Sequence, residues 1–250
     1  MAIYRKEAKE AAAEFVDQHF PLCQCALLAG STVRGEATIS SDLDIVIFDE
    51  QISGSYRESF RENGWPIEVF VHNFRSYQAF FQSDCSRARP SLPTMVAEGT
   101  AIKGEVRLKA IKAEAEYLLE KGPEAWTEET IGIKRYFLTD LLDDFIGSSD
   151  RSEDLFIASA LSASASEFVL RTNGRWIGQS KWIVRALRNF DQDYANNFTA
   201  VFNDFYRTGQ KAEVIKLVDN ILIPCGGRLF EGFSQGKKTH SNINGKAEKI

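Results

Sequence analysis

Two apolar segments joined through a glycine–serine bend constrain the fold of this chain more than any other feature. The first segment ends directly before Gly30 and Ser31, and a polar stretch follows. The second segment begins with Asp42-Leu43-Asp44, in which two acids alternate with an apolar residue. Short apolar runs bounded by turn residues are typical of buried strands. We therefore predict strands over residues 25–29 and 43–48, connected through the bend.

The two acids of the second strand are suitably placed to bind a metal ion. Side chains alternate between the two faces of a strand, so Asp42 and Asp44 point the same way. Two neighbouring carboxylates that are buried and unpaired repel each other at a high cost in free energy. Mg²⁺ removes that cost, because it prefers oxygen ligands, and it keeps coordination positions open for phosphate oxygens. Two such ions would clamp the attacking and leaving oxygens of an in-line displacement.

The bend complements these acids as a candidate phosphate site. Gly30 allows a tight turn and a close approach of the backbone to a ligand. Ser31 is a favourable cap for a short helix, whose first free N–H groups would attract anions. We therefore expect the oxygens of a triphosphate at Gly30 and Ser31. Arg34 either adds positive charge to those phosphates or forms a surface ion pair with an acid.

A third acid, Glu68, lies among apolar residues in a segment that reads as another strand, residues 66–72. An isolated acid in the core of a strand is unexpected unless it is paired or bound to a metal. If this strand lies beside residues 43–48, Glu68 would be a third metal ligand, a general base for an incoming hydroxyl group, or both. The alternative is that Glu68 pairs with an arginine at the edge of a sheet.

These residues resemble the nucleotidyltransferase superfamily that includes DNA polymerase beta. Its pattern is Gly-Ser, a short helix, Asp-x-Asp on a strand and a third acid on a later strand, and the match covers residues 26–71. The chain is most similar to the bacterial branch of aminoglycoside and lincosamide nucleotidyltransferases and of minimal nucleotidyltransferases from toxin–antitoxin pairs. The resemblance implies transfer of a nucleoside monophosphate from a nucleoside triphosphate, with Mg²⁺ held by Asp42, Asp44 and Glu68 and with pyrophosphate leaving.

The pattern of apolar residues changes near Gly104 and predicts an α+β protein. Before this point strands and helices mix, and we assign residues 1–104 to a nucleotidyltransferase α/β domain with a small mixed sheet. After it the apolar residues follow the spacing of helices, which predicts an all-α helical bundle over residues 105–233. Residues 234–250 are polar and rich in lysine, and we expect a flexible tail there.

The expected elements follow from apolar periodicity and from breaking residues. Around the three strands of the first domain, we predict helices over 4–20 and 74–83, a short helix over 56–62 in a polar connection, and a loop marked by Pro90 and Pro93. In the bundle, we predict helices over 105–121, 127–146, 152–172, 179–190, 193–206 and 210–222.

Three polar residues of the predicted bundle are candidates for substrate binding. Asp140 and Asp144 are four residues apart and share one face of a helix. They would bind a cationic acceptor or activate its hydroxyl group, or else lie on a solvated surface. Lys181 falls in the first turn of a helix, where a cation opposes the helix dipole, and this placement indicates a nearby anion such as the β- or γ-phosphate. The resemblance implies a cleft between the two parts that holds nucleotide and acceptor.

The charge of the chain favours a small acceptor over a nucleic acid. With 35 acidic and 30 basic residues, the net charge is −5. Neither half has the basic stripe of a protein that grips a nucleic-acid backbone. An acidic cleft would attract a small cation such as an aminosugar. No segment has the apolar length of a membrane span, and the N-terminus lacks the apolar core of a signal peptide, so we expect a cytoplasmic protein without membrane contact.

We therefore predict a Mg²⁺-dependent enzyme that transfers AMP from ATP to a hydroxyl group of a small molecule, such as an aminoglycoside-like antibiotic. Two alternatives stay open. One is a nucleotidyltransferase of a toxin–antitoxin type system that modifies a protein or tRNA, and the other is a non-catalytic nucleotide-binding regulator. The presence of all three acids favours catalysis over regulation. The sequence leaves open whether the chain forms a homodimer, as some antibiotic nucleotidyltransferases do.

Overall fold

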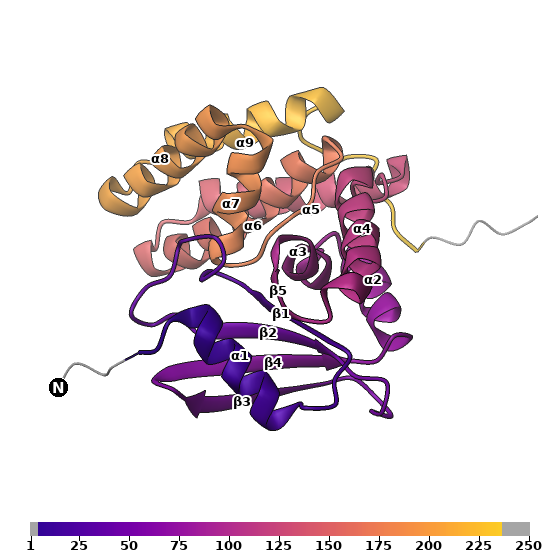
Figure 1. Ribbon diagram of the computed structural model, residues 1–250. Helices are drawn as coiled ribbons and strands as arrows, with labels where there is room; N and C mark the ends of the chain where they lie inside the picture. Colours follow the sequence, from indigo (N-terminus) through magenta and orange to yellow (C-terminus); the bar gives the residue numbers. More distant parts are fainter. Residues whose placement is uncertain (1–4, 237–250) are drawn as a thin grey trace, which may run out of the picture. The chain divides into compact units, whose positions relative to one another are not determined.

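The computed structural model describes residues 5–236, which divide into two compact units. The sheet unit contains the described residues up to Glu124 together with Gly174–Ile177, and the helical unit contains Ala125–Asn173 and the described residues from Gly178 onward. A mixed sheet lies in the first unit, and helices make up the second (Figure 1). The predicted α+β class, a small mixed sheet followed by a helical region, is confirmed.

The described residues form one five-stranded sheet. Its strands are β1 (Cys25–Ala29), β2 (Leu43–Phe48), β3 (Tyr56–Glu62), β4 (Trp65–His72) and β5 (Thr100–Lys103). The spatial order is β3-β4-β2-β1-β5, in which β2 and β4 run parallel and the other neighbours run antiparallel. All of β1 and all but one residue of β2 are buried, as continuous apolar runs predict.

One face of the sheet is covered by α1 (Ala8–His19) (Figure 1). Its buried side chains recur at helical spacing, so they form a single apolar stripe. Phe15 and Val16 of this stripe join Ile45 and Val69 of the sheet in one buried cluster. The odd-numbered positions of β2 and β4 therefore belong to the face under α1, and the even-numbered positions, which include Asp44 and Glu68, belong to the opposite face.

The opposite face is covered by α2 (Ser76–Ser86), α3 (Ser91–Glu98) and α4 (Glu105–Lys121). Here Phe48 packs in one cluster with Phe81 and with Leu108 of α4. The predicted first domain ends at Gly104, whereas the sheet unit continues to Glu124. The sheet unit includes α4 because the apolar side of this helix packs into the core on the face of the sheet opposite α1.

The helical unit consists of α5 (Glu128–Gly147), α6 (Arg151–Thr172), α7 (Lys181–Phe190), α8 (Gln192–Thr208), α9 (Ala212–Leu222) and the 3₁₀ turn η1 (Ile223–Cys225). Side-chain caps fix several helix starts. Thr127 accepts a hydrogen bond from the backbone N–H of Thr130, and Asp150 accepts one from Ser152. The five helices predicted between residues 127 and 222 correspond to α5–α9, with ends that differ by at most two residues.

Three local predictions were wrong. Residues 56–62 form β3 instead of a short helix, because Asn63 and Gly64 both take positive φ and close a hairpin with β4. Residues 31–35 form turns, and no helix follows Ser31 before β2 in the described residues. Pro93, expected in a loop, lies in the first turn of α3, where its missing N–H costs no helical hydrogen bond.

Two further predictions fall at the ends of the chain. The predicted tail, residues 234–250, lies outside the described residues from position 237 onward. Residues 1–4 also lie outside them, and they include the predicted start of the first helix. Among the helices that are described, none combines the length and the apolar character of a membrane span.

Candidate metal centre

Three carboxylates converge where β2 and β4 run side by side. Asp44 of β2 lies opposite Glu68 of β4 in the parallel register, and Asp42 directly precedes β2. One oxygen from each of the three side chains lies within 4.8 Å of the others. All three residues are partly buried. The structure thus brings together the three acids that the sequence singled out, in an arrangement whose donor set suits a hard divalent cation.

The electrostatics of the cluster are unfavourable without a cation. Burial, and after it the charges of Asp42 and Glu68, raise the pKa of Asp44 to about 6. The carboxylates therefore repel one another in a partly desolvated site. A cation bound between them would reverse this effect, because an opposite charge at short range favours the ionised carboxylate.

Gly30 brings the backbone of the bend against this cluster. Its φ is +77°, and a Cβ atom at this position would lie 2.0 Å from Oδ2 of Asp44. Residue 30 therefore has no room for a side chain and needs a conformation that only glycine adopts readily. Ten residues separate the bend from the acids in the sequence, and the two form one site because Ala29 pairs with Asp44 across β1 and β2.

The loop between the bend and β2 is held by its own polar contacts. The N–H of Glu36 donates to the carbonyl of Ser31 at 2.9 Å, which closes a turn. The hydroxyl of Ser31 donates to Oγ of Ser41 at 3.2 Å, and the N–H of Thr38 donates to the same Oγ at 2.8 Å. Ser31 is therefore fixed at the start of the loop that leads to Asp42.

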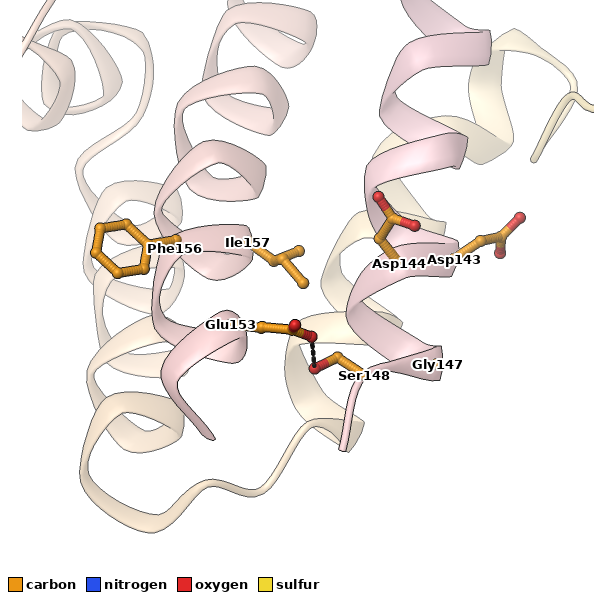
Figure 2. A pocket seen from close by; sticks show the side chains of 7 residues that line it. All are labelled: Asp143, Asp144, Gly147, Ser148, Glu153, Phe156 and Ile157. Atoms are coloured by element: carbon orange, nitrogen blue, oxygen red, sulfur yellow. Dashed lines mark hydrogen bonds between the residues drawn. The ribbon is translucent and has the colours of Figure 1, made fainter. Parts of the chain in front are cut away.

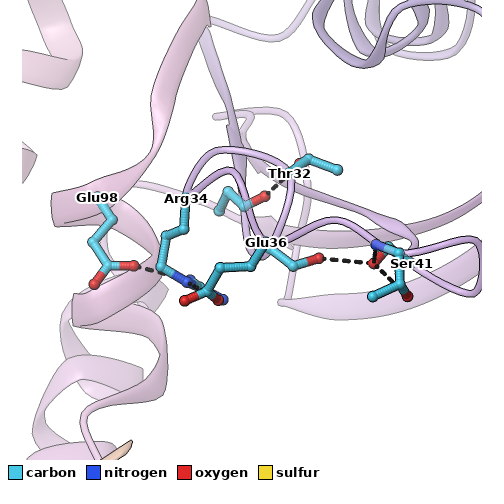
Figure 3. A network of polar contacts seen from close by, with 8 residues as sticks. Thr32, Arg34, Glu36, Ser41 and Glu98 are labelled. Atoms are coloured by element: carbon cyan, nitrogen blue, oxygen red, sulfur yellow. Dashed lines mark hydrogen bonds and ion pairs between the residues drawn. The ribbon is translucent and has the colours of Figure 1, made fainter.

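Arg34 belongs to an ion-pair network on the same loop (Figure 3). Its guanidinium group donates to Glu36 and to Glu98 of α3, at 3.0 Å in each case. A surface ion pair is one of the two roles that the sequence analysis left open for Arg34. The contact with a phosphate stays a prediction.

Arg57, which the sequence analysis did not single out, forms an ion pair with Glu68. It comes from β3, the edge strand beside β4. The alternative role of Glu68, pairing with an arginine at the sheet edge, therefore occurs together with its place in the acidic cluster. The signal that reveals Arg57 is the Asn63-Gly64 turn, which sets the register of β3 against β4.

The other predicted site residues lie in the helical unit. Asp140 and Asp144 are exposed on α5, and Lys181 is the exposed first residue of α7. Asp144 lines a pocket of about 600 Å³, and Asp140 is not among the residues that line it. Figure 2 shows the pocket between α5 and α6, lined by Asp143, Asp144, Gly147, Ser148, Glu153, Phe156 and Ile157.

Comparisons with known proteins find a distant likeness among solved structures. No protein-family model matches the chain, and no curated protein matches it. Among solved structures, the chain is similar to a nucleotidyltransferase-like protein from Exiguobacterium sibiricum 255-15, with 12% sequence identity and a TM-score of 0.46. The similarity covers 87% of this chain and 73% of that one. At this level the likeness carries no argument about function. An argument about function depends on the site itself.

Proposed function

We propose that this chain is a metal-dependent nucleotidyltransferase. The observation that supports the proposal is the convergence of Asp42, Asp44 and Glu68 within 4.8 Å, with the backbone of Gly30 against Asp44. Three carboxylates beside a glycine bend provide both a cation site and a place where phosphate oxygens can approach the backbone closely. The order of these residues along the chain also follows the pattern of the nucleotidyltransferase superfamily.

The residues fit a divalent cation such as Mg²⁺. Asp42, Asp44 and Glu68 would hold it, and when bound it supplies charge stabilisation for phosphate oxygens during transfer. The backbone at Gly30 and Ser31 would bind the phosphates of the nucleoside triphosphate. An acceptor hydroxyl oxygen forms a bond to the α-phosphorus, the bond to the β-phosphate oxygen breaks, and pyrophosphate leaves. The hydroxyl proton passes to a carboxylate of the site, for which Glu68 is the candidate.

We propose ATP as the donor and a hydroxyl group of a small molecule as the acceptor. An aminoglycoside-like acceptor suits the net charge of −5, and the acidic lining of the pocket at Asp144 suits an amino group. Asp140, Lys181 and Arg34 stay candidates for contacts with acceptor or phosphates. A role in antibiotic resistance would follow from such an acceptor.

The test is incubation of the full chain with each nucleoside triphosphate, Mg²⁺ and a library of hydroxylated acceptors. Pyrophosphate release and a mass increase of the acceptor by one nucleoside monophosphate are expected, and the Asp44→Asn variant serves as the inactive control. Nucleotide binding without pyrophosphate release for any acceptor would instead identify a non-catalytic regulator. A mass increase found only on added tRNA or protein would assign the chain to the toxin–antitoxin alternative.

A further inference from the structure

Arg57 is held in a defined position beside the acidic cluster. Its guanidinium group contacts Oε1 of Glu68 and lies over the ring of Phe70, 5.0 Å from the ring centroid. Arg57 lies opposite Phe70 in the register of β3 and β4, and Ser59 lies opposite Glu68, so the ion pair is diagonal across the two strands. Cross-strand neighbours at this diagonal are within reach of a long side chain.

The contact places a positive charge beside a carboxylate that would help to bind a cation. Glu68 offers its carboxylate both to Arg57 and to the shared site with Asp42 and Asp44. In the absence of a cation, Arg57 offsets part of the repulsion among the three acids. When a divalent cation binds, the same guanidinium repels it and competes for the Glu68 oxygens.

We propose that Arg57 is a positioning residue that competes with the divalent cation for Glu68 and thereby lowers the cation affinity of the site. The inference rests on the proposed function, because it takes the acidic cluster as a cation site. Arg57 holds the Glu68 side chain in place when the site has no cation. It also raises the cation concentration that is needed to displace its guanidinium group from Glu68. Strand β3 thus contributes a residue to a site whose ligands lie on β2 and β4 and just before β2.

Arg61 provides a matched control on the same strand. It lies four residues from Arg57, on the same face of β3, opposite Pro66. Both side chains are exposed, and within residues 5–236 Arg61 forms no ion pair. Replacing either arginine by glutamine removes one positive charge from the strand, and only the change at position 57 removes the partner of Glu68.

The experiment measures binding of Mn²⁺ to the full chain by electron paramagnetic resonance of the free ion, without nucleotide, at neutral pH and constant ionic strength. Arg57→Gln is expected to bind Mn²⁺ about tenfold more tightly than the wild type, from the loss of the positive charge that contacts Glu68. Arg61→Gln is expected to stay within about twofold, since Arg61 forms no ion pair with the acids within residues 5–236 and its exposed charge is screened. Arg57→Lys, which keeps the charge, is expected to stay within about threefold of the wild type.

The outcomes separate this inference from the proposed function. If the wild type and all three variants fail to bind Mn²⁺, the acidic cluster is not a cation site and both proposals are wrong. If the wild type binds and Arg57→Gln is no tighter than Arg61→Gln, or is weaker than the wild type, only the competition is disproved. An Arg57→Lys variant as tight as Arg57→Gln also overturns it. Circular dichroism spectra of all variants verify that the fold is intact.

Discussion

A Cβ atom on Gly30 would lie 2.0 Å from Oδ2 of Asp44, so the bend after β1 and the acid on β2 touch directly. This contact links the two motifs of the site. The backbone of Gly30 takes a positive φ, +77°, and passes against the carboxylate. A phosphate ligand of a cation at Asp44 would therefore lie next to backbone atoms of the bend.

We expect Gly30→Ala to abolish cation binding and transfer activity. The added methyl group must displace the Asp44 carboxylate from its position, and the positive φ adds about 1–2 kcal/mol of backbone strain. The measurements are Mn²⁺ affinity and pyrophosphate release. Activity of Gly30→Ala within about threefold of the wild type would contradict the assignment of the bend to the site.

Gly35→Ala is the matched control for this variant. Gly35 also has a positive φ, +70°, but a Cβ atom there would meet nothing within 4 Å. The two variants therefore share the backbone strain and differ in the collision. We expect Gly35→Ala to lose about 1 kcal/mol of unfolding free energy and to keep its cation affinity.

We expect Asp44→Asn to abolish turnover and leave the fold intact. The amide cannot supply a charged ligand, and its burial is less costly than that of an ionised carboxylate. The unfolding free energy at neutral pH, measured without metal, should equal that of the wild type or exceed it by about 1–2 kcal/mol. A variant that retains turnover would refute the role of Asp44 in the site.

The strands that carry the acids were predictable because their apolar residues are continuous or alternate. The segment around Ile45 is buried at nearly every position, and the segment around Val69 alternates between buried and partly buried residues, so both admit few other interpretations. The acids of β2 and β4 are then recognisable as the charged residues within two otherwise apolar strands. Their spatial proximity, however, depends on the parallel pairing of β2 with β4, which no local pattern of the sequence specifies.

Strand β3 was missed because it is an edge strand whose residues are exposed or only partly buried. Phe60 packs beside Phe15 of α1, at 5.0 Å between ring centroids, whereas most of its neighbours on β3 are charged and exposed. Such a strand lacks the apolar run that marks β1 and β2. The Asn63-Gly64 pair was the available signal, and with it the ion pair of Arg57 and Glu68 becomes predictable as a cross-strand contact.

If the acceptor is a small cation, Asp144→Asn should raise its KM about three- to tenfold with little change in kcat. Asp144 lines the pocket between α5 and α6, and its charge would attract an amino group. Asp140→Asn, on the same helix but outside the pocket lining, should change KM less than twofold. Equal effects of the two substitutions, measured in steady-state kinetics with the identified acceptor, would count against a binding role for the pocket.

The pH dependence of stability should reveal the raised pKa of Asp44. The pKa of Asp44 is raised to about 6 by burial and by the neighbouring acids. A raised pKa means that the folded protein holds this proton more tightly than the unfolded chain does. The stabilisation is complete below the ordinary pKa near 3.8 and is lost as the pH rises through 6.

The measurement is the unfolding free energy of the wild type and of Asp44→Asn between pH 4 and pH 7, in a chelating buffer. We expect the difference between the two proteins to change by up to about 3 kcal/mol, with the wild type losing stability relative to the variant as the pH rises. A difference that stays constant over this range would show that Asp44 titrates normally.

His72 should produce the opposite slope in the same range. It is buried at the far end of β4 from Glu68, and burial lowers its pKa to about 4. Ser55 donates to Ser76 at 2.7 Å, so its hydroxyl oxygen accepts a hydrogen bond from Nδ1 of a neutral His72 at 3.0 Å. Protonation of the ring would place a charge in this buried site, and Asp84 offsets only part of its cost.

A lowered pKa means that the neutral ring stabilises the fold above the ordinary pKa near 6.5 and that this stabilisation is lost as the pH falls toward 4. His72→Asn leaves a constant packing defect and removes the titration. The wild type should therefore lose up to about 3 kcal/mol relative to this variant between pH 7 and pH 4. Because Asp44 acts with the opposite sign, the two contributions partly cancel in the wild-type profile, and the two single variants are needed to separate them. Parallel profiles of the wild type and His72→Asn would disprove the buried neutral ring.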